Sequence, residues 1–283
     1  MGGSFALALK RAKLVKRVIG YSKSPTTTER ARQLGVIDAA APSALNAVSG
    51  ADLILVAVPV SASEPIFKAI RHGIAPGALI MDVGSTKGDV IAAARAGLQT
   101  KFGYFVPAHP IAGKEVAGIG HADADLFRNR AVVLTPTQDT RLPNIQRAKD
   151  LWRALGSHVT TMTHEVHDEA FAAVSHLPHL LAFAFIQGIV SQAHGMDYFN
   201  LAGPGFRDFS RIAASDSTIW RDVLLANRAQ VLAQSEAFRR ALDDFEALIR
   251  AGDAQALERA IAAASRARAG WQPAGTAPDE SGE

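Results

Sequence analysis

The chain has 283 residues, of which 48% are hydrophobic and 20% charged, and it contains no cysteine. This length and composition predict a globular protein with one large domain or two ordinary ones. The net charge of +3 is too weak to indicate nucleic-acid binding, and no basic stripe is interleaved with aromatic residues. The lack of cysteine excludes disulfides, thiolate nucleophiles and cysteine-ligated metal sites, and it fits a reducing compartment.

The best apolar run in the sequence, Leu53–Val60, has the length of a strand, and no run approaches the length needed to span a bilayer. The first 28 residues carry six Lys and Arg and no acidic residue, which is typical of some transit peptides. A basic helix followed by a strand explains the same composition. We therefore expect a cytoplasmic protein with no membrane partner.

Strand and helix patterns alternate through the first half of the chain. Asp52–Val60 and Ala78–Val83 are near-continuous apolar runs, as is typical of parallel strands buried on both faces. The expected strands are Val15–Tyr21, Asp52–Val60, Ala78–Val83, Tyr104–Ala108, Ala131–Thr135 and His158–Met162, and the expected helices are Pro25–Leu34, Ser61–His72, Thr86–Leu98 and Thr140–Leu155. This alternation predicts βαβ units and a parallel sheet.

Helical periodicity dominates the second half, with expected breaks near Pro178, between 195 and 204, and at Gly252. We expect a dinucleotide-binding domain over residues 1–163 and a helical domain over residues 164–269. The remaining residues, 270–283, are rich in Gly, Pro and acid, which predicts a disordered tail. Leu180–Val190 is apolar all round and is therefore expected inside a bundle or a dimer interface.

The chain begins with Gly2, Gly3 and Ser4 ahead of an apolar helix with a basic end. A glycine turn that begins a helix offers N–H groups and a positive dipole end to a diphosphate; an unstructured terminus is the alternative. The next expected strand ends near Ser22 and Lys23, where a dinucleotide fold carries an acid for the ribose of NAD. A hydroxyl beside a cation suits the 2′-phosphate of NADP better, although a solvated turn would look the same.

Two further strand ends carry candidate ligand-binding groups. Val58 and Pro59 close the run Asp52–Val60, and ligands in open α/β sheets bind outside the carboxyl ends of strands. Simple termination of the strand is the alternative. Ser85 and Lys87 follow the next apolar run; the serine would also serve as a helix cap. Because a cation is disfavoured at a helix start, Lys87 indicates an anionic ligand.

Two loops offer acid–base and carboxylate chemistry. His109 directly follows a strand and begins a loop that reaches Glu115, and a histidine there can accept a proton near neutral pH. A histidine bonded to a loop carbonyl is the alternative. A Gly-Pro-Gly turn at 203–205 leads into a helix with Asp208 and Arg211, and arginine is the bidentate partner of carboxylates. A helix with surface salt bridges would show the same residues.

Histidines recur in the helical half as two pairs spaced i, i+3, His164 with His167 and His176 with His179. Such pairs share a helix face and can bind metal. The zinc-protease spacing H-E-x-x-H is absent, and we expect no metal. His176 and His179 flank Pro178, which predicts that they lie at a helix start as donors toward a ligand.

Together these residues indicate hydride transfer from a small anionic substrate. From Gly2 to about Arg268 the chain resembles the prephenate/arogenate (cyclohexadienyl) dehydrogenase family. The most specific matching segments are 82–87 (DVGSTK), 109–115 (HPIAGKE), 173–179 (AVSHLPH) and 205–213 (GFRDFSRIA). The resemblance implies a Rossmann-like parallel-sheet domain followed by an all-α dimerisation domain, on the plan of 6-phosphogluconate dehydrogenase, and a homodimer.

The resemblance also implies the reaction, which is oxidative decarboxylation of prephenate to 4-hydroxyphenylpyruvate, or of arogenate to tyrosine, with NAD or NADP. It makes His109 the acceptor of the substrate hydroxyl proton and Ser85 the group that orients that hydroxyl and the nicotinamide. Arg211 pairs with a substrate carboxylate, and His179 assists. The residues in supporting or gating positions are His176, Asp208 and Glu115.

The family's dinucleotide fingerprint G-x-G-x-x-G is incomplete here, since Gly2 matches its last glycine. We expect a start codon assigned too late, with about twenty to thirty residues missing; a short form of low activity is the alternative. Two other hypotheses stay open, a two-domain dehydrogenase of the β-hydroxyacid type and a truncated dimeric binding protein. The motifs decide neither prephenate against arogenate nor NAD against NADP, and they leave feedback by tyrosine open.

Overall fold

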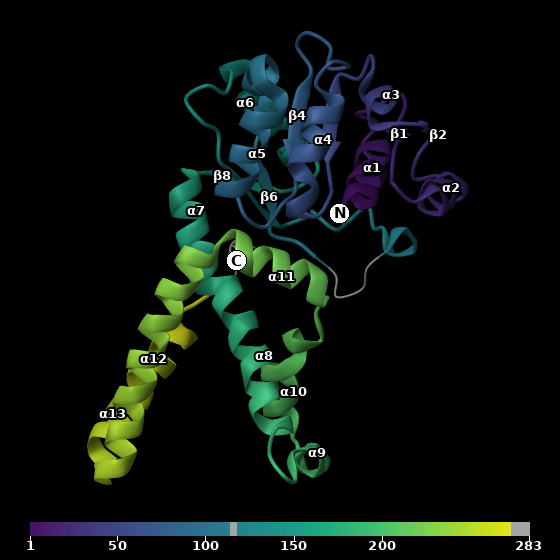
Figure 1. Cartoon of the computed structure of the whole chain (residues 1–283). Helices are drawn as coiled ribbons and strands as arrows, with labels where there is room; N and C mark the ends of the chain where they lie inside the picture. The colour runs from purple at the N-terminus through teal and green to yellow at the C-terminus, as the bar shows by residue number, and fades with distance from the viewer. Residues whose placement is uncertain (114–117, 273–283) are drawn as a thin grey trace, which may run out of the picture.

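The computed structural model describes residues 1–113 and 118–272. They form an α/β domain and a helical domain that extends away from it (Figure 1). The strands are β1 (Ile19–Gly20), β2 (Ala39–Ala40), β3 (Leu53–Val56), β4 (Leu79–Asp82), β5 (Phe105–Val106), β6 (Ala108–Pro110), β7 (Ala131–Leu134) and β8 (His158–Thr161). The helices of this domain are α1 (Gly2–Arg11), α2 (Pro25–Gln33), α3 (Ala44–Val48), α4 (Ser63–Ile70), α5 (Gly88–Leu98) and α6 (Leu142–Ala154), with 3₁₀ turns η1 (Val60–Ala62), η2 (Gln99–Tyr104) and η3 (Ile119–His121).

The strands pair in three groups, β1 with β2, β3 with β4 and β5, and β6 with β7 and β8. All pairs are parallel except β6 with β7, which is antiparallel with His109 opposite Val133. The expected parallel sheet is therefore confirmed except at this pair. A parallel return needs a crossover, usually a long helix, whereas the described part of the chain between β6 and β7 contains only the short turn η3.

Several expected elements are shorter than the sequence pattern. The strand expected over Val15–Tyr21 is reduced to the two residues of β1, and β2 and α3 were not predicted. The strand expected over Tyr104–Ala108 is divided at Pro107, which has no N–H to donate to a ladder. Its carbonyl accepts from the backbone N–H of Thr135 at 3.0 Å, so the chain continues into β6 beside β7.

The central strands are buried on both faces, as the apolar runs predicted. In β4, Ile80 packs into a cluster with α4 and α5, while Leu79 and Met81 face a second cluster with α1 and α6. Phe5 of α1 contacts the fully buried Trp152 of α6 with ring centroids 4.9 Å apart. This core fixes the carboxyl end of β4, where the chain turns toward α5.

The chain is helical after Thr163, whose hydroxyl accepts from the N–H of Val166 at the start of α7. The helices of this domain are α7 (His164–Phe171), α8 (Leu177–Val190), α9 (Gly195–Tyr198), α10 (Pro204–Ser210), α11 (Ser217–Ala226), α12 (Arg228–Ala251) and α13 (Ala254–Ala269), with 3₁₀ turns η5 (Phe199–Leu201) and η6 (Arg211–Ala214). The expected break at Gly252 is confirmed by its left-handed conformation, φ 65°. Of the expected tail, residues 273–283 lie outside the described residues.

The expected break at Pro178 is wrong. A π turn, Ala172–His176, joins α7 to α8, so residues 164–190 form one continuous helical run. A proline inside an α-helix leaves a carbonyl without its donor and crowds the preceding turn, and a wider turn relieves both effects. His176 and His179 therefore lie within a long helix and not at the start of one.

This helical run, His164–Val190, is by length and composition apolar enough to cross a membrane, since an 18-residue window within it has a mean hydropathy of 1.5. The expectation that no segment reaches that length was wrong, because the run includes α7 and the π turn. Within one chain α8 buries only Leu177 and Ala182. Figure 1 shows α8 and the α12–α13 pair diverging, which leaves their apolar residues uncovered by this chain.

Candidate active site

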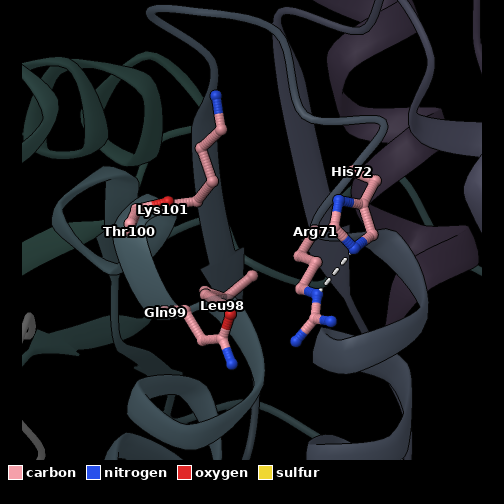
Figure 2. A pocket seen from close by; sticks show the side chains of 6 residues that line it. All are labelled: Arg71, His72, Leu98, Gln99, Thr100 and Lys101. Carbon is pink, nitrogen blue, oxygen red and sulfur yellow. Dashed lines mark hydrogen bonds between the residues drawn. The ribbon is translucent and has the colours of Figure 1, made fainter.

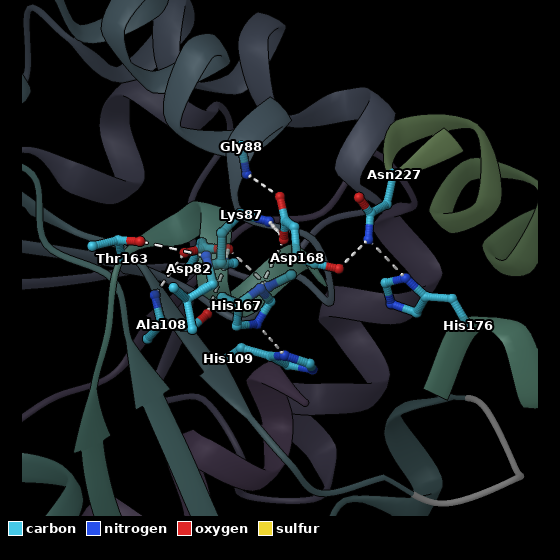
Figure 3. A network of polar contacts seen from close by, with 12 residues as sticks. Asp82, Lys87, Gly88, Ala108, His109, Thr163, His167, Asp168, His176 and Asn227 are labelled. Atoms are coloured by element: carbon cyan, nitrogen blue, oxygen red, sulfur yellow. Dashed lines mark hydrogen bonds and ion pairs between the residues drawn. The ribbon is translucent and has the colours of Figure 1, made fainter. Parts of the chain in front are cut away.

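Three side chains from two domains form a hydrogen-bonded row at the carboxyl end of the sheet (Figure 3). Nδ1 of His109 in β6 lies 2.8 Å from Nε2 of His167 in α7, and Nδ1 of His167 lies 2.7 Å from Oδ1 of Asp168. His109 is 9% exposed and His167 is fully buried. We call His109, His167 and Asp168 the relay.

The start of α5 holds the acidic end of the relay. The carboxylate of Asp168 accepts from the backbone N–H groups of Lys87 and Gly88 at 2.9 and 2.8 Å. Burial alone would raise the pKa of Asp168, but the hydrogen bonds from His167, Gly88 and Lys87 outweigh it and lower the pKa. Asp168 is therefore ionised at neutral pH and can only accept hydrogen bonds.

The ionised Asp168 fixes the protons along the relay. Nδ1 of His167 must carry a proton because it faces a carboxylate. Burial lowers the pKa of His167, so its ring is neutral and its Nε2 is unprotonated and can accept a hydrogen bond. His109 must then donate from Nδ1. Burial first, and then electrostatic interactions with His167 and Lys87, hold the pKa of His109 well below its usual range, which leaves its Nε2 as a proton acceptor.

The expectation that Lys87 binds an anionic ligand was wrong. Its side chain is fully buried, forms an ion pair with Asp82 and donates to the carbonyl of Ala108 at 2.9 Å. Asp82 also accepts from the N–H groups of Gly84 and Ala108 at 2.8 and 2.9 Å. The buried pair thus ties the turn that carries Ser85 to the residue before His109.

His176 and Asn227 extend this network on the other side. Nδ2 of Asn227 donates to the backbone oxygen of Asp168 at 2.7 Å and lies 3.1 Å from Nδ1 of His176. Both side chains are buried, and burial lowers the pKa of His176 to about 4. His176 also lies beside the backbone of Ser85. The structure therefore brings Ser85, His109 and His176 into one connected network.

His179 and Arg211 form a second group of expected substrate residues. The ring of His179 stacks on Trp220 of α11 with centroids 3.4 Å apart and planes at 18°. Its Nδ1 donates to the carbonyl of Ser175 at 2.9 Å, which leaves Nε2 as an acceptor while the ring is neutral. Burial lowers the pKa of His179, and the positive charge of Arg211 lowers it further; α8, which carries His179, packs against η6, which carries Arg211.

Two of the remaining expected residues are less informative. Asp208 is exposed on α10 and pairs with the neighbouring Arg207 at 3.3 Å. Glu115 lies outside the described residues.

Across residues 1–113 and 118–272, no three His, Asp or Glu side chains come together in a way that could hold a metal ion.

The expected cofactor residues lie around the start of α1 and the ends of β1 and β3. A Cβ on Gly2 would lie 3.1 Å from Cβ of Ala57, and one on Gly3 would lie 2.5 Å from Cδ1 of Ile119. The start of α1 is thus pressed against the loop that follows β3, where Val58 and Pro59 lie. Backbone N–H groups without bulky side chains suit a diphosphate, so these residues fit a dinucleotide.

The other cofactor candidates serve local contacts in the structure. Ser4 is buried, and its hydroxyl accepts from the N–H of Asp123 at 3.0 Å. Ser22 follows β1, where its hydroxyl accepts from the N–H of Ser24 at 3.2 Å, and Lys23 is exposed. Ser22 and Lys23 therefore remain near the strand end at which a ribose would lie, while Ser4 helps to anchor α1.

A pocket of about 170 Å³ lies at the opposite edge of the sheet, at the carboxyl ends of α4 and α5 (Figure 2). Its cationic side chains are Arg71 and Lys101, and Arg71 donates to Nε2 of His72 at 2.9 Å. Cations at helix carboxyl ends complement the helix dipoles. The pocket contains none of the expected site residues.

The residues that sequence reasoning missed are His167, Asp168 and Asn227. His167 was weighed as a metal ligand and not as the partner of His109, since the two are 58 positions apart. The adjacent His-Asp pair was a usable signal, because a carboxylate next to a histidine commonly orients its ring. Asn227 gave no signal, since it lies between two helices and acts through its tertiary contacts.

Both domains of the chain are similar to known proteins. Residues 5–161 match the family model of the prephenate dehydrogenase nucleotide-binding domain, and residues 163–263 match that of the prephenate dehydrogenase dimerization domain. A prephenate dehydrogenase from Bacillus subtilis is 35% identical over 265 residues, which cover 92% of this chain and 70% of the relative.

Solved structures are similar over nearly the whole chain. Prephenate dehydrogenase from Aquifex aeolicus, in complex with hydroxyphenyl propionate and NAD+, has a TM-score of 0.88 at 32% identity and covers 94% of this chain and 93% of its own. Synechocystis arogenate dehydrogenase has a TM-score of 0.80 at 28% identity, with 94% of each chain covered. The two family models cover both domains, and the chain therefore belongs to the prephenate dehydrogenase family of oxidoreductases.

Proposed function

We propose that the chain catalyses the NAD(P)-dependent oxidative decarboxylation of prephenate or arogenate. The observation that carries this proposal is the relay, which leaves Nε2 of His109 unprotonated at the carboxyl end of the sheet. A substrate hydroxyl must lose its proton as the carbon that bears it is oxidised, and a neutral imidazole is suited to accept that proton. The family match and the fold are consistent with this chemistry.

In this mechanism bound NAD(P)+ would supply the hydride acceptor for the ring carbon that bears the hydroxyl. Nε2 of His109 accepts the hydroxyl proton, and His167 and Asp168 stabilise the imidazolium that results. Ser85, on the turn after β4, orients the hydroxyl. Loss of carbon dioxide then makes the substrate ring aromatic, which renders the step effectively irreversible.

The residues that bind the two ligands come from opposite domains. Gly2 and Gly3 at the start of α1 would hold the diphosphate, with Val58 and Pro59 beside the nicotinamide ribose. On the helical side, Arg211 would pair with a substrate carboxylate as a bidentate donor. Its positive charge already acts on His179, which supports a shared role for these two residues at the carboxylate.

Two substitutions test the assignment. His109→Asn should lower kcat by about 10²- to 10⁴-fold, the usual contribution of general base catalysis. Arg211→Ala should raise KM for the substrate with little change in the free energy of unfolding, because it removes a carboxylate clamp. Normal kcat in the first variant would remove His109 from the chemistry, and an unchanged KM in the second would remove Arg211 from the substrate site.

The choice of substrate and cofactor needs kinetics with prephenate and arogenate, each with NAD and NADP. We infer a preference for NADP, because Ser22 and the exposed Lys23 follow β1 where an acidic residue would repel a 2′-phosphate. Lys23→Glu should then raise KM for NADP and leave KM for NAD nearly unchanged. Equal effects on both cofactors would contradict this inference.

We also infer a cytoplasmic homodimer without a membrane or nucleic-acid partner. Exposed apolar residues on α8 and α12, such as Phe185, Leu232 and Leu242, are expected to be buried against a second subunit. The matching family model is that of a dimerization domain. Light scattering should give twice the monomer mass of 29.9 kDa. A monomer at micromolar concentration, or partition into detergent or vesicles, would contradict the assembly.

A further inference from the structure

We propose that Asn227 is a positioning residue that sets the tautomer of His176 and connects both arms of the active site. One arm leads through Asp168 to the relay and His109. The other leads through His176 to the turn that carries Ser85. The role in catalysis rests on the proposed function, whereas the tautomer of His176 is a property of the folded chain alone.

The position of Asn227 suits a connecting group. It lies at the junction between α11 and α12, where it ends one helix and precedes the other, and it is 5% exposed. Its Nδ2 donates to the backbone oxygen of Asp168 at 2.7 Å. A carbonyl oxygen can only accept, so this bond fixes the orientation of the amide group. The NH₂ group of Asn227 must face inward.

The same NH₂ group lies 3.1 Å from Nδ1 of His176. An amide N–H can only be received by an unprotonated ring nitrogen. The ring of His176 is fully buried, which favours its neutral form. Its one ring proton must then be on Nε2. Asn227 thus selects the Nε2–H tautomer, as Asp168 selects the Nδ1–H tautomer of His167.

The proton on Nε2 of His176 is directed at the active site. This nitrogen is buried and has no hydrogen-bond partner of normal geometry among the described residues, although His176 lies beside the backbone of Ser85. A buried N–H without a partner destabilises the folded state. The Nε2–H of His176 can therefore donate a hydrogen bond to an oxygen of the Ser85 backbone. It can also donate to a carboxamide or carboxylate oxygen of a ligand bound beside that backbone.

The decisive variant is Asn227→Asp, which keeps the shape of the side chain and removes its donors. A carboxylate would repel the lone pair of Nδ1, so the proton of His176 should move to Nδ1 or the ring should become charged. The donor toward Ser85 is lost in the first case. We expect kcat to fall by about tenfold or more, which corresponds to one hydrogen bond that is misdirected in the transition state.

Asn144→Asp is the matched control. Asn144 is also buried, and its Nδ2 donates to two backbone oxygens, of Ala78 at 2.9 Å and of Tyr104 at 3.1 Å. The two substitutions therefore remove the same kind of contact from the folded state. Both should lower the midpoint of urea unfolding, but only the change at Asn227 should alter His176 and kcat.

Nitrogen-15 NMR of histidine-labelled protein reads the tautomer directly, with the signals of His176 assigned by their loss in His176→Gln. In the wild type we expect a proton on Nε2 and none on Nδ1, and this pattern should change in Asn227→Asp alone. A proton on Nδ1 in the wild type overturns the proposal, even if the variant fails to fold. A changed tautomer with normal kcat also overturns it, for the catalytic role.

The ligand arm of the test separates this proposal from the proposed function. If the wild type shows the expected tautomer but no turnover with prephenate or arogenate, the proposed function fails and the tautomer assignment stands. Saturation with NAD+ or NADP+ alone, followed by the same spectra, shows whether the cofactor contributes the oxygen. A shift of the Nε2 proton signal without substrate assigns that oxygen to the cofactor, and a shift that needs substrate assigns it to the substrate.

Discussion

Replacing His167 with phenylalanine separates the chemistry of the relay from its packing. The ring of His167 lies 4.5 Å from that of Phe171 and 5.1 Å from that of His109, between centroids. A phenyl ring fills nearly the same space and keeps these contacts. It removes the acceptor for Nδ1 of His109 and one of three donors to Asp168, whose bonds to Lys87 and Gly88 remain.

The size of the effect follows from the burial of His109. Without His167, its Nδ1–H would be a buried donor with no acceptor, which costs about 1–3 kcal/mol. The ring therefore changes to the Nε2–H tautomer, which cannot accept the substrate proton. Restoring the reactive tautomer requires the same free energy, so we expect kcat to fall by about 10- to 100-fold.

The assay is the initial rate of NAD(P)H formation at saturating substrate, measured together with urea unfolding of the same sample. His164→Phe, three positions earlier on α7 and one-third exposed, is the control and should keep its kcat. The reasoning is refuted if His167→Phe is folded, as judged by unfolding, and retains kcat within about threefold of the wild type.

Three further predictions concern stability. Lys87→Met leaves the buried Asp82 unpaired and should cost about 3–5 kcal/mol by urea unfolding, whereas Lys68→Met on the surface should cost less than about 1 kcal/mol; equal losses would contradict this. Because burial lowers the pKa of His176 to about 4, its contribution to stability is complete above pH 6.5 and falls by up to about 3 kcal/mol as pH drops to 4, which unfolding at both pH values checks. Gly97→Ala would place a Cβ 2.5 Å from that of Phe67 and should lower Tm by several degrees, since α4 and α5 must separate; an unchanged Tm would show that they can.

The sequence predicted the fold class because its signals are local. The run Ala78–Val83 around Ile80 is apolar except at Asp82, and this near-continuous pattern is enough to predict a strand buried on both faces. The reversal between β6 and β7 was missed because strand direction depends on the path of the loop, and no residue type encodes it. The continuous helix through Pro178 was missed because local rules describe how proline ends a helix, whereas here the chain absorbs it in a wider turn.

The candidate site was predictable to the extent that one residue type implied one task. The sequence placed His109 in a loop after a strand and so indicated its role, although the residue lies within β6. Lys87 shows the limit, since a cation at a helix start indicated an anionic ligand while its true partner, Asp82, lies five positions earlier and is buried with it. Whether a charge faces a ligand or a neighbour depends on burial, which the sequence alone does not give.

The π turn at Ala172–His176 also has a consequence for the evolution of this chain. A π turn holds one residue more than an α turn, so it behaves as a single insertion within a helix. One residue corresponds to a rotation of about 100° around the helix axis. The wider turn absorbs that rotation, so removing Ala173 would restore a regular α turn and leave α8 facing the same way relative to His167. A relative that lacks this residue can therefore present the same face of α8 on a regular α-helix.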